Sequence, residues 1–166
     1  MQVENNKEVF VQKITEYEGL IHKVCHMYVR TATDRQDLFQ EIVIQLWKAY
    51  SSFRNEAKFG TWLYRVSINT AITGLRKDKN ITQPYEPNSL PITIDDTYIY
   101  KQKEEQFAQL YIAIELLNDI EKAIVMLYLE DKSYLEMENI LGINEGTLRV
   151  KMNRIKEKLR QITKKY

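Results

Sequence analysis

Residues 133–159, SYLEMENILGINEGTLRVKMNRIKEKL, carry the clearest structural motif in the second half of this chain. Ser133 followed three residues later by Glu136 has the form of a capping box, which opens a helix. Gly142 stands where a left-handed helix end is expected, and Asn144 can cap the helix that follows. A helix, a short glycine-containing turn and a second helix together predict a helix-turn-helix.

The second helix of this motif separates its residues by face. Four apolar residues recur at helical spacing and are expected to pack inward: Leu148, Met152, Ile155 and Leu159. The polar residues between them are expected to lie mainly outward: Arg149, Lys151, Asn153, Arg154, Lys156 and Lys158. Residues 142–166 hold eight basic and two acidic residues, a net charge of +6, whereas the whole chain carries +1. A cationic helix face attracts phosphates, and Arg and Asn can read base edges, so this motif predicts DNA binding. A solvated basic face of a helical bundle is the alternative interpretation.

All three prolines, Pro84, Pro87 and Pro91, fall in one window of the chain. Because proline disfavours helix for itself and for the residue before it, the window predicts an extended, flexible linker over residues 80–103. We therefore expect two small domains, residues 1–79 and 104–166. With only five glycines in 166 residues, the composition favours helices over a turn-rich β architecture, and the predicted fold is all-α.

Apolar spacing predicts the helices of each domain. The first helix has an inward face made of Phe10, Ile14, Tyr17, Ile21, Val24 and Tyr28. A second helix is predicted over residues 35–50, with an apolar side made of Leu38, Ile42, Leu46 and Trp47. A third is predicted from an N-cap at Thr61 to about Arg76, with a core side made of Leu63, Val66, Thr70 and Leu75. In the second domain, a helix is expected over 104–117, and Asn118 with Glu121 is expected to cap the next one.

Residues 52–79 combine positive charge with aromatic rings. Their net charge is +4, and the aromatic residues among them are Phe53, Phe59, Trp62 and Tyr64. Cations can hold a nucleic-acid backbone while aromatic faces stack on unpaired bases, which favours single-stranded DNA as a partner. The alternative is that some of these rings belong to the core, since large apolar side chains are usually buried.

Several classes of protein are disfavoured. Cys25 is the one cysteine and cannot form an internal disulfide, the first residues are polar, and no apolar run approaches the roughly 20 residues of a membrane span. We expect a soluble cytoplasmic protein without membrane insertion. His22, Cys25 and His26 lack the further ligands that a zinc site generally needs, and no catalytic triad or phosphate loop is present. We expect no metal, no cofactor and no enzymatic activity.

Three segments resemble extracytoplasmic-function (ECF) sigma factors, in the order found in that family. DRQDLFQE (34–41) resembles their acidic-hydrophobic segment, and FRNEAKFGTWLYRVSINTAI (53–72) is similar to their promoter-opening segment. Residues 133–154 resemble their C-terminal helix-turn-helix. The resemblance implies that the first domain binds core RNA polymerase and the −10 element of the promoter. It implies that the second domain binds the −35 element, and that the protein directs transcription initiation.

Carried over position by position, the resemblance implies three sets of residues. The polymerase-binding set is Asp34, Asp37, Leu38, Gln40, Glu41, Leu46 and Trp47. The set for the −10 element is Phe53, Arg54, Asn55, Lys58, Trp62, Arg65, Asn69, Arg76 and Lys77. The set for the −35 element is Thr147, Arg149, Lys151, Asn153 and Arg154. Val150 departs from the family, which commonly has a small polar residue there, and Gly74 lowers the helix propensity near Arg76.

Two other functions remain open from the residues alone. A helix-turn-helix regulator that acts without polymerase would explain the last third of the chain but leaves the first 80 residues without a role. A helical partner-binding protein would explain the amphipathic helices but not the clustered basic face. The family resemblance also implies an anti-sigma factor as a partner, although no residue here identifies one.

Overall fold

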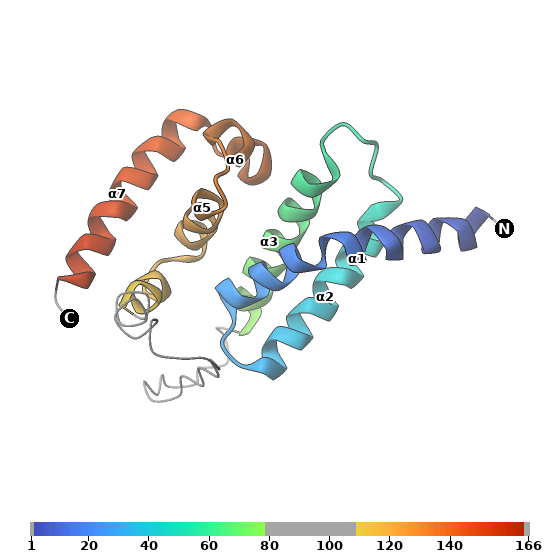
Figure 1. Ribbon diagram of the computed structural model, residues 1–166, viewed down its shortest axis with the longest axis horizontal. Helices are drawn as coiled ribbons and strands as arrows, with labels where there is room; N and C mark the ends of the chain where they lie inside the picture. Colours follow the sequence, from blue (N-terminus) through green and yellow to red (C-terminus); the bar gives the residue numbers. More distant parts are fainter. Residues whose placement is uncertain (1, 79–108, 165–166) are drawn as a thin grey trace, which may run out of the picture.

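The computed structural model describes residues 2–78 and 109–164, with side chains for residues 6–77 and 109–164. Within these ranges the chain forms helices and no strand, as expected for an all-α fold. We refer to residues 2–78 as the first lobe and to residues 109–164 as the second lobe (Figure 1). The predicted linker, residues 80–103, lies outside the described residues, so the predicted domain boundaries remain predictions.

The first lobe consists of α1 (Gln2–Tyr28), α2 (Ala32–Tyr50) and α3 (Phe59–Asp78), each packed against the other two (Figure 1). The inward face predicted for α1 is confirmed: all of its residues are buried except Tyr17, which packs half-buried against the core. Cys25 is also fully buried, and burial raises the pKa of its thiol to about 11. On α2, Ile42 and Leu46 are the buried residues.

Two helices begin earlier than predicted. The predicted start of α2 near Arg35 is three residues late, because the Thr31 hydroxyl accepts a hydrogen bond of 3.0 Å from the Asp34 amide and caps the helix there. The predicted N-cap of α3 at Thr61 is wrong. The Trp62 amide already donates to the carbonyl of Lys58 at 3.1 Å, so Thr61 lies inside the first turn.

The core side predicted for α3 is only partly correct. Leu63 is fully buried, but the three other predicted residues are half-buried: Val66, Thr70 and Leu75. The remaining buried residues are Tyr64, Ser67, Ile68, Ala71 and Ile72. The physical reason is that α3 is covered on two sides, by α1 and α2 on one and by the second lobe on the other.

The second lobe begins with a helical segment at residues 109–115, and the first residues of the helix predicted over 104–117 lie outside the described range. Next come α5 (Asp119–Leu129), α6 (Tyr134–Leu141) and α7 (Glu145–Thr163). The predicted cap of α5 is confirmed, because Asn118 and Glu121 exchange hydrogen bonds of 2.9 and 3.0 Å. Gly142 ends α6 with a φ of 70°, and a three-residue turn leads into α7, so the predicted helix-turn-helix is confirmed.

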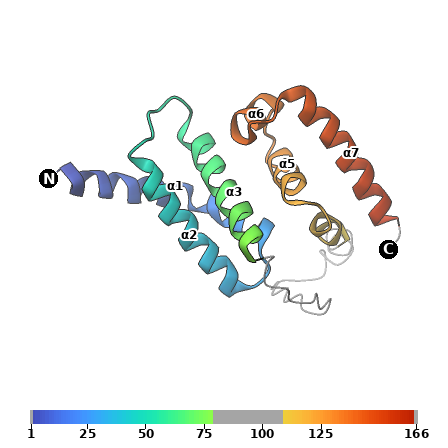
Figure 2. The same ribbon diagram turned by 180° about the vertical axis from the view of Figure 1, so that it is seen from behind.

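The two lobes lie against each other, with α3 beside α6 and α1 beside α5 (Figures 1 and 2). The Tyr28 hydroxyl donates a 2.7 Å hydrogen bond to the carbonyl of Asp119, and its burial raises the pKa of that phenol well above its usual value. Lys23 forms a 2.7 Å ion pair with Glu130. These contacts bring the helix-turn-helix close to α3.

Candidate nucleic-acid and polymerase interfaces

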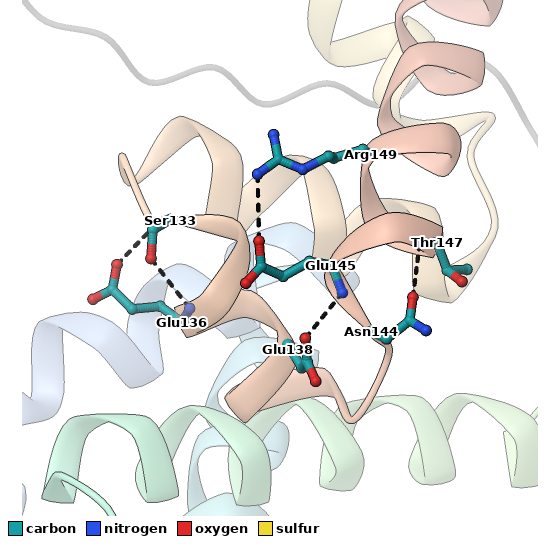
Figure 3. A network of polar contacts seen from close by, with 7 residues as sticks. All are labelled: Ser133, Glu136, Glu138, Asn144, Glu145, Thr147 and Arg149. Carbon is teal, nitrogen blue, oxygen red and sulfur yellow. Dashed lines mark hydrogen bonds and ion pairs between the residues drawn. The ribbon is translucent and has the colours of Figure 1, made fainter.

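Side-chain caps hold the helix-turn-helix rigidly (Figure 3). Ser133 and Glu136 form the predicted capping box, and the hydrogen bond from the Ser133 amide lowers the pKa of the Glu136 carboxyl. The Asn144 side chain accepts from the Thr147 amide at 2.8 Å, and Glu138 on α6 accepts from the Glu145 amide at 2.9 Å (Figure 3). At each helix start, side chains therefore accept hydrogen bonds from two backbone amides, and the Glu138 contact ties α6 to α7 directly.

The outward face of α7 carries most of the residues predicted for the −35 element. Gly146, Thr147, Arg149, Val150, Asn153 and Arg154 are all exposed. They recur three and four residues apart, so they form one continuous face. Arg149 is held in place by a 3.3 Å ion pair with Glu145 and by the ring of Tyr134, 4.5 Å from its guanidinium carbon. The face is thus a preformed, cationic surface.

Of the six polar residues predicted to lie mainly outward on α7, three are exposed and three lysines are half-buried. Lys151 is half-buried. Lys156 donates a 3.0 Å hydrogen bond to the Tyr128 hydroxyl, and Lys158 forms a 3.0 Å ion pair with Glu121. Burial acts to raise the pKa of Glu121, but hydrogen bonds from Asn118 and Lys158 outweigh it and lower that pKa. The basic charge of α7 is therefore divided between the outward face and its packing on α5.

A pocket of about 410 Å³ opens between the loop before α3 and the first turns of α3. It is lined by Ser52, Phe53, Arg54, Glu56, Ala57, Trp62 and Arg65. The rings of Phe53 and Trp62 lie 4.9 Å apart between centroids, and Arg54 and Arg65 line the same pocket. The structure thus brings together four of the residues predicted for the −10 element, while Asn55 and Lys58 are exposed on the same loop outside this lining.

Two other aromatic residues of this segment support the fold. Tyr64 is 4% exposed, and burial raises the pKa of its phenol to about 12. Phe59 is half-buried, with its ring 5.2 Å from that of Tyr17 and 5.3 Å from that of Trp62. The expectation that Tyr64 could stack on an unpaired base is therefore wrong, because its ring is enclosed by the core.

The remaining residues of the −10 set lie along α3 toward the second lobe. Arg65 and Asn69 line a pocket of about 420 Å³ with α6, and the Arg65 guanidinium donates a hydrogen bond to the carbonyl of Asn139.

Arg76 lies 14 residues after Trp62, roughly 21 Å along the helix axis. It lines a third pocket, of about 490 Å³, with Lys151 and Arg154. The structure therefore separates Arg76 from the aromatic pocket and places it opposite the −35 set. Lys77 is exposed beside Arg76.

The exposed face of α2 holds most of the predicted polymerase-binding residues. Asp37, Gln40, Glu41 and Trp47 are exposed, and the Glu41 carboxylate accepts a 2.7 Å hydrogen bond from Gln45. Ile44 is 46% exposed on this face. The sequence prediction missed Ile44. The available signal was its helical position, because Ile44 comes three residues after Glu41 and two residues after Ile42, which belongs to the buried side of the helix.

Three residues of the polymerase-binding set have other roles in the structure. Leu46 is fully buried, so its inclusion as a contact residue is corrected: it packs in the core of the first lobe. Leu38 is half-buried against the same core. Asp34 takes part in the cap of α2, where its carboxylate accepts a 2.6 Å hydrogen bond from Thr31.

His22, Cys25 and His26 do not converge on a common point. The His22 ring stacks on Phe39 with 4.6 Å between centroids, and Nδ1 of His26 lies 2.8 Å from the carbonyl of His22. Within residues 2–78 and 109–164, no three His, Cys, Asp or Glu side chains are grouped as metal ligands. None of the helices in these ranges is long and apolar enough to cross a membrane.

Comparison with known proteins gives two family matches. Residues 14–81 match the model of Sigma-70 region 2, and residues 107–159 match that of Sigma-70 region 4. ECF RNA polymerase sigma factor SigW of Bacillus subtilis is 25% identical, over 94% of this chain and 89% of that protein. RNA polymerase sigma factor SigV of the same species is 27% identical, over 97% of this chain and 95% of that protein.

Two solved structures share the fold. Sigma factor RpoE of Bartonella quintana, in complex with the anti-sigma factor NepR, superposes with a TM-score of 0.71 at 16% identity, over 95% of this chain and 98% of that chain. CnrH, in complex with the cytosolic domain of CnrY, gives 0.66 at 15% identity, over 94% and 88%.

The paired helical lobes and the two matched regions define a transcription initiation factor rather than an enzyme. The chain belongs to the sigma-70 family as an ECF RNA polymerase sigma factor, which confirms the resemblance seen in the three sequence motifs. It binds core RNA polymerase and promoter DNA in transcription initiation.

Proposed function

We propose that this sigma factor recognises a −10 element with the first lobe and a −35 element with the outward face of α7. It docks on core RNA polymerase through the exposed face of α2. The observation that carries the proposal is the pocket beside α3, where Phe53, Trp62, Arg54 and Arg65 are gathered from a loop and a helix. Aromatic rings and basic side chains around one pocket suit an unpaired base with its phosphate. A preformed pocket can offset the cost of unstacking that base.

The exposed face of α2 suits a helical partner that is apolar at its centre and basic at its rim. Ile44 and Trp47 supply large exposed apolar side chains, while Asp37 and Glu41 supply exposed carboxylates on the same face. Apolar groups at the centre of an interface provide most of its affinity, and the surrounding charges select the partner. Leu46 does not take part, since it is buried.

We further propose that the two lobes correspond to the two functional domains, and that an anti-sigma factor binds this chain, as NepR binds RpoE in the solved complex. The cytoplasm is the proposed site of action, because core RNA polymerase works there. Arg65 and Asn69 face α6 in the free protein. The lobes must therefore separate before α3 can meet DNA.

Transcription of the host's genomic DNA by purified core polymerase, with and without this protein, tests the proposal by mapping RNA 5′ ends. We expect new start sites that share two spaced upstream elements. New start sites without a shared upstream pair would contradict the division between −10 and −35 elements. Binding of duplex DNA by the free protein, with no new start sites, would favour the polymerase-independent regulator.

A charge-reversal pair tests the polymerase face in the same assay. Asp37→Arg with Glu41→Arg should weaken core polymerase binding at least tenfold, because it turns the acidic rim of α2 basic. The matched control is Glu16→Arg with Glu18→Arg, which reverses two exposed carboxylates on α1. Equal loss in both pairs would point to overall charge rather than to the α2 face.

A further inference from the structure

One apolar side chain interrupts the cationic outward face of α7. Val150 is 50% exposed and stands between Arg149 and Lys151 in the sequence. Its neighbours one turn away are Gly146 before it and Arg154 after it, and both are exposed. Val150 is therefore at the centre of the face proposed to read the −35 element, rather than at its edge.

Val150 has no structural role that explains its exposure. The residues that anchor α7 to the rest of the second lobe are Leu148, Met152 and Ile155, on the opposite side of the helix. An exposed β-branched residue also lowers helix stability relative to the Lys, Arg or Gln that are common at such positions. An apolar group held at the centre of a charged face suits a partner that offers an apolar group there.

Gly146 adds a second observation about the same place. A Cβ built on Gly146 would meet only Oδ1 of Asn144, at 3.6 Å, which is ordinary van der Waals contact. The packing of the protein therefore does not require glycine here, although glycine weakens a helix. Without a side chain at Gly146, a partner can approach the helix closely on the side next to Val150.

In the major groove, the one apolar group at a base edge is the C5-methyl of thymine, which apolar side chains contact. We propose that Val150 is a specificity residue that packs on the C5-methyl of a thymine in the −35 element. Arg149 and Arg154 on either side fix the helix by contacting phosphates or guanine. This inference rests on the proposed role of α7. It adds the kind of base that α7 selects: a pyrimidine with a C5-methyl, which in unmodified promoter DNA is thymine.

Deoxyuridine substitution tests the contact at the level of one methyl group. The −35 element is first selected from a randomised duplex library with the holoenzyme formed by core polymerase and the full chain. Each thymine on either strand is then replaced singly by deoxyuridine. We expect one position at which the loss of the methyl weakens holoenzyme binding about fourfold, the ratio that corresponds to one buried methyl-sized group.

A double-mutant cycle assigns the methyl contact to Val150. Val150→Ala should bind the thymine promoter about as weakly as the wild type binds the deoxyuridine promoter, and should no longer distinguish the two. The control is Val11→Ala on α1, a valine of similar exposure (53%), which should keep the full fourfold difference. Alanine favours helix, so Val150→Ala is expected to fold, and its melting temperature checks this.

Each outcome decides between separate hypotheses. A selected element without thymine, or a deoxyuridine effect that Val150→Ala retains, overturns the inference and leaves the sigma function intact. If the holoenzyme selects only one upstream element, the proposed role of α7 fails, and the inference fails with it. The selected thymine can also be replaced by 5-methylcytosine or by cytosine, each paired with guanine. If the methyl itself is read, the holoenzyme should bind the 5-methylcytosine duplex more tightly than the cytosine duplex.

Discussion

At the scale of single residues, Ile44 and Leu46 are two positions apart on α2 and lie in opposite environments. Leu46 is fully buried among α1, α2 and α3, whereas Ile44 is 46% exposed beside Glu41 and Trp47. The family resemblance selected Leu46 as a contact residue and passed over Ile44. The resemblance assigns a role to a position in the sequence. Which side of α2 is buried, however, is decided by its packing against α1 and α3.

Alanine substitutions at these two positions should separate stability from binding. Leu46→Ala is expected to lower the free energy of unfolding by about 2–5 kcal/mol, because it leaves a cavity in the core. Ile44→Ala should leave stability nearly unchanged and weaken core polymerase binding about tenfold, because it removes an exposed apolar contact. Denaturant titration and a core-binding titration measure the two effects. The opposite pattern would mean that the α2 face does not bind polymerase through Ile44.

At the scale of elements, α7 carries two kinds of basic residue that its sequence does not distinguish. Arg154 is exposed on the outward face. Lys156, two residues later, donates to the Tyr128 hydroxyl and has its ammonium 4.5 Å from the centre of that ring. The apolar stripe of α7 was predictable from its spacing, because it is a property of the helix alone. The pairing of Lys156 depends on where α5 lies, and sequence spacing does not contain that information.

Arg154→Ala and Lys156→Ala form a matched pair for the DNA face. Arg154→Ala should reduce the slope of log affinity against log salt concentration by about 0.9, the value for one lost phosphate contact. A larger effect confined to certain sequences would mean that Arg154 reads a base edge instead. Lys156→Ala should leave the slope unchanged. Holoenzyme binding to one promoter over a series of salt concentrations measures both slopes. Equal reductions would show that Lys156 leaves α5 when DNA binds.

At the scale of the whole molecule, part of the candidate −10 surface on α3 faces the second lobe. Arg65 is held by the carbonyl of Asn139, and Arg76 shares a pocket with Lys151 and Arg154. If Arg65 and Arg76 contact DNA as proposed, both must first leave the second lobe. Exposed ion pairs such as that of Lys23 with Glu130 contribute little free energy, so the closed arrangement can be opened by a partner.

A distance measurement between the lobes tests this opening. Spin labels at Glu18→Cys and Gln161→Cys occupy two exposed positions, one on each lobe. Cys25 is buried and its thiol pKa is raised to about 11, so it should not compete for the label. We expect the distance between the labels to lengthen when core polymerase and promoter DNA bind. An unchanged distance would show that the lobes bind DNA without separating.

Features that depend on neighbours along the chain could be predicted from the amino-acid sequence. The caps at Asn118, Ser133 and Asn144, the left-handed turn at Gly142 and the apolar stripe of α1 were all predictable, because each involves residues within a turn or two of one another. The family followed from three such local motifs. Tertiary structure alone decided the burial of Tyr64, the pairing of Lys156 and the contact of Arg65 with α6. These three features depend on which helices pack against each other. That packing is determined by close contacts between side chains that are far apart in the sequence.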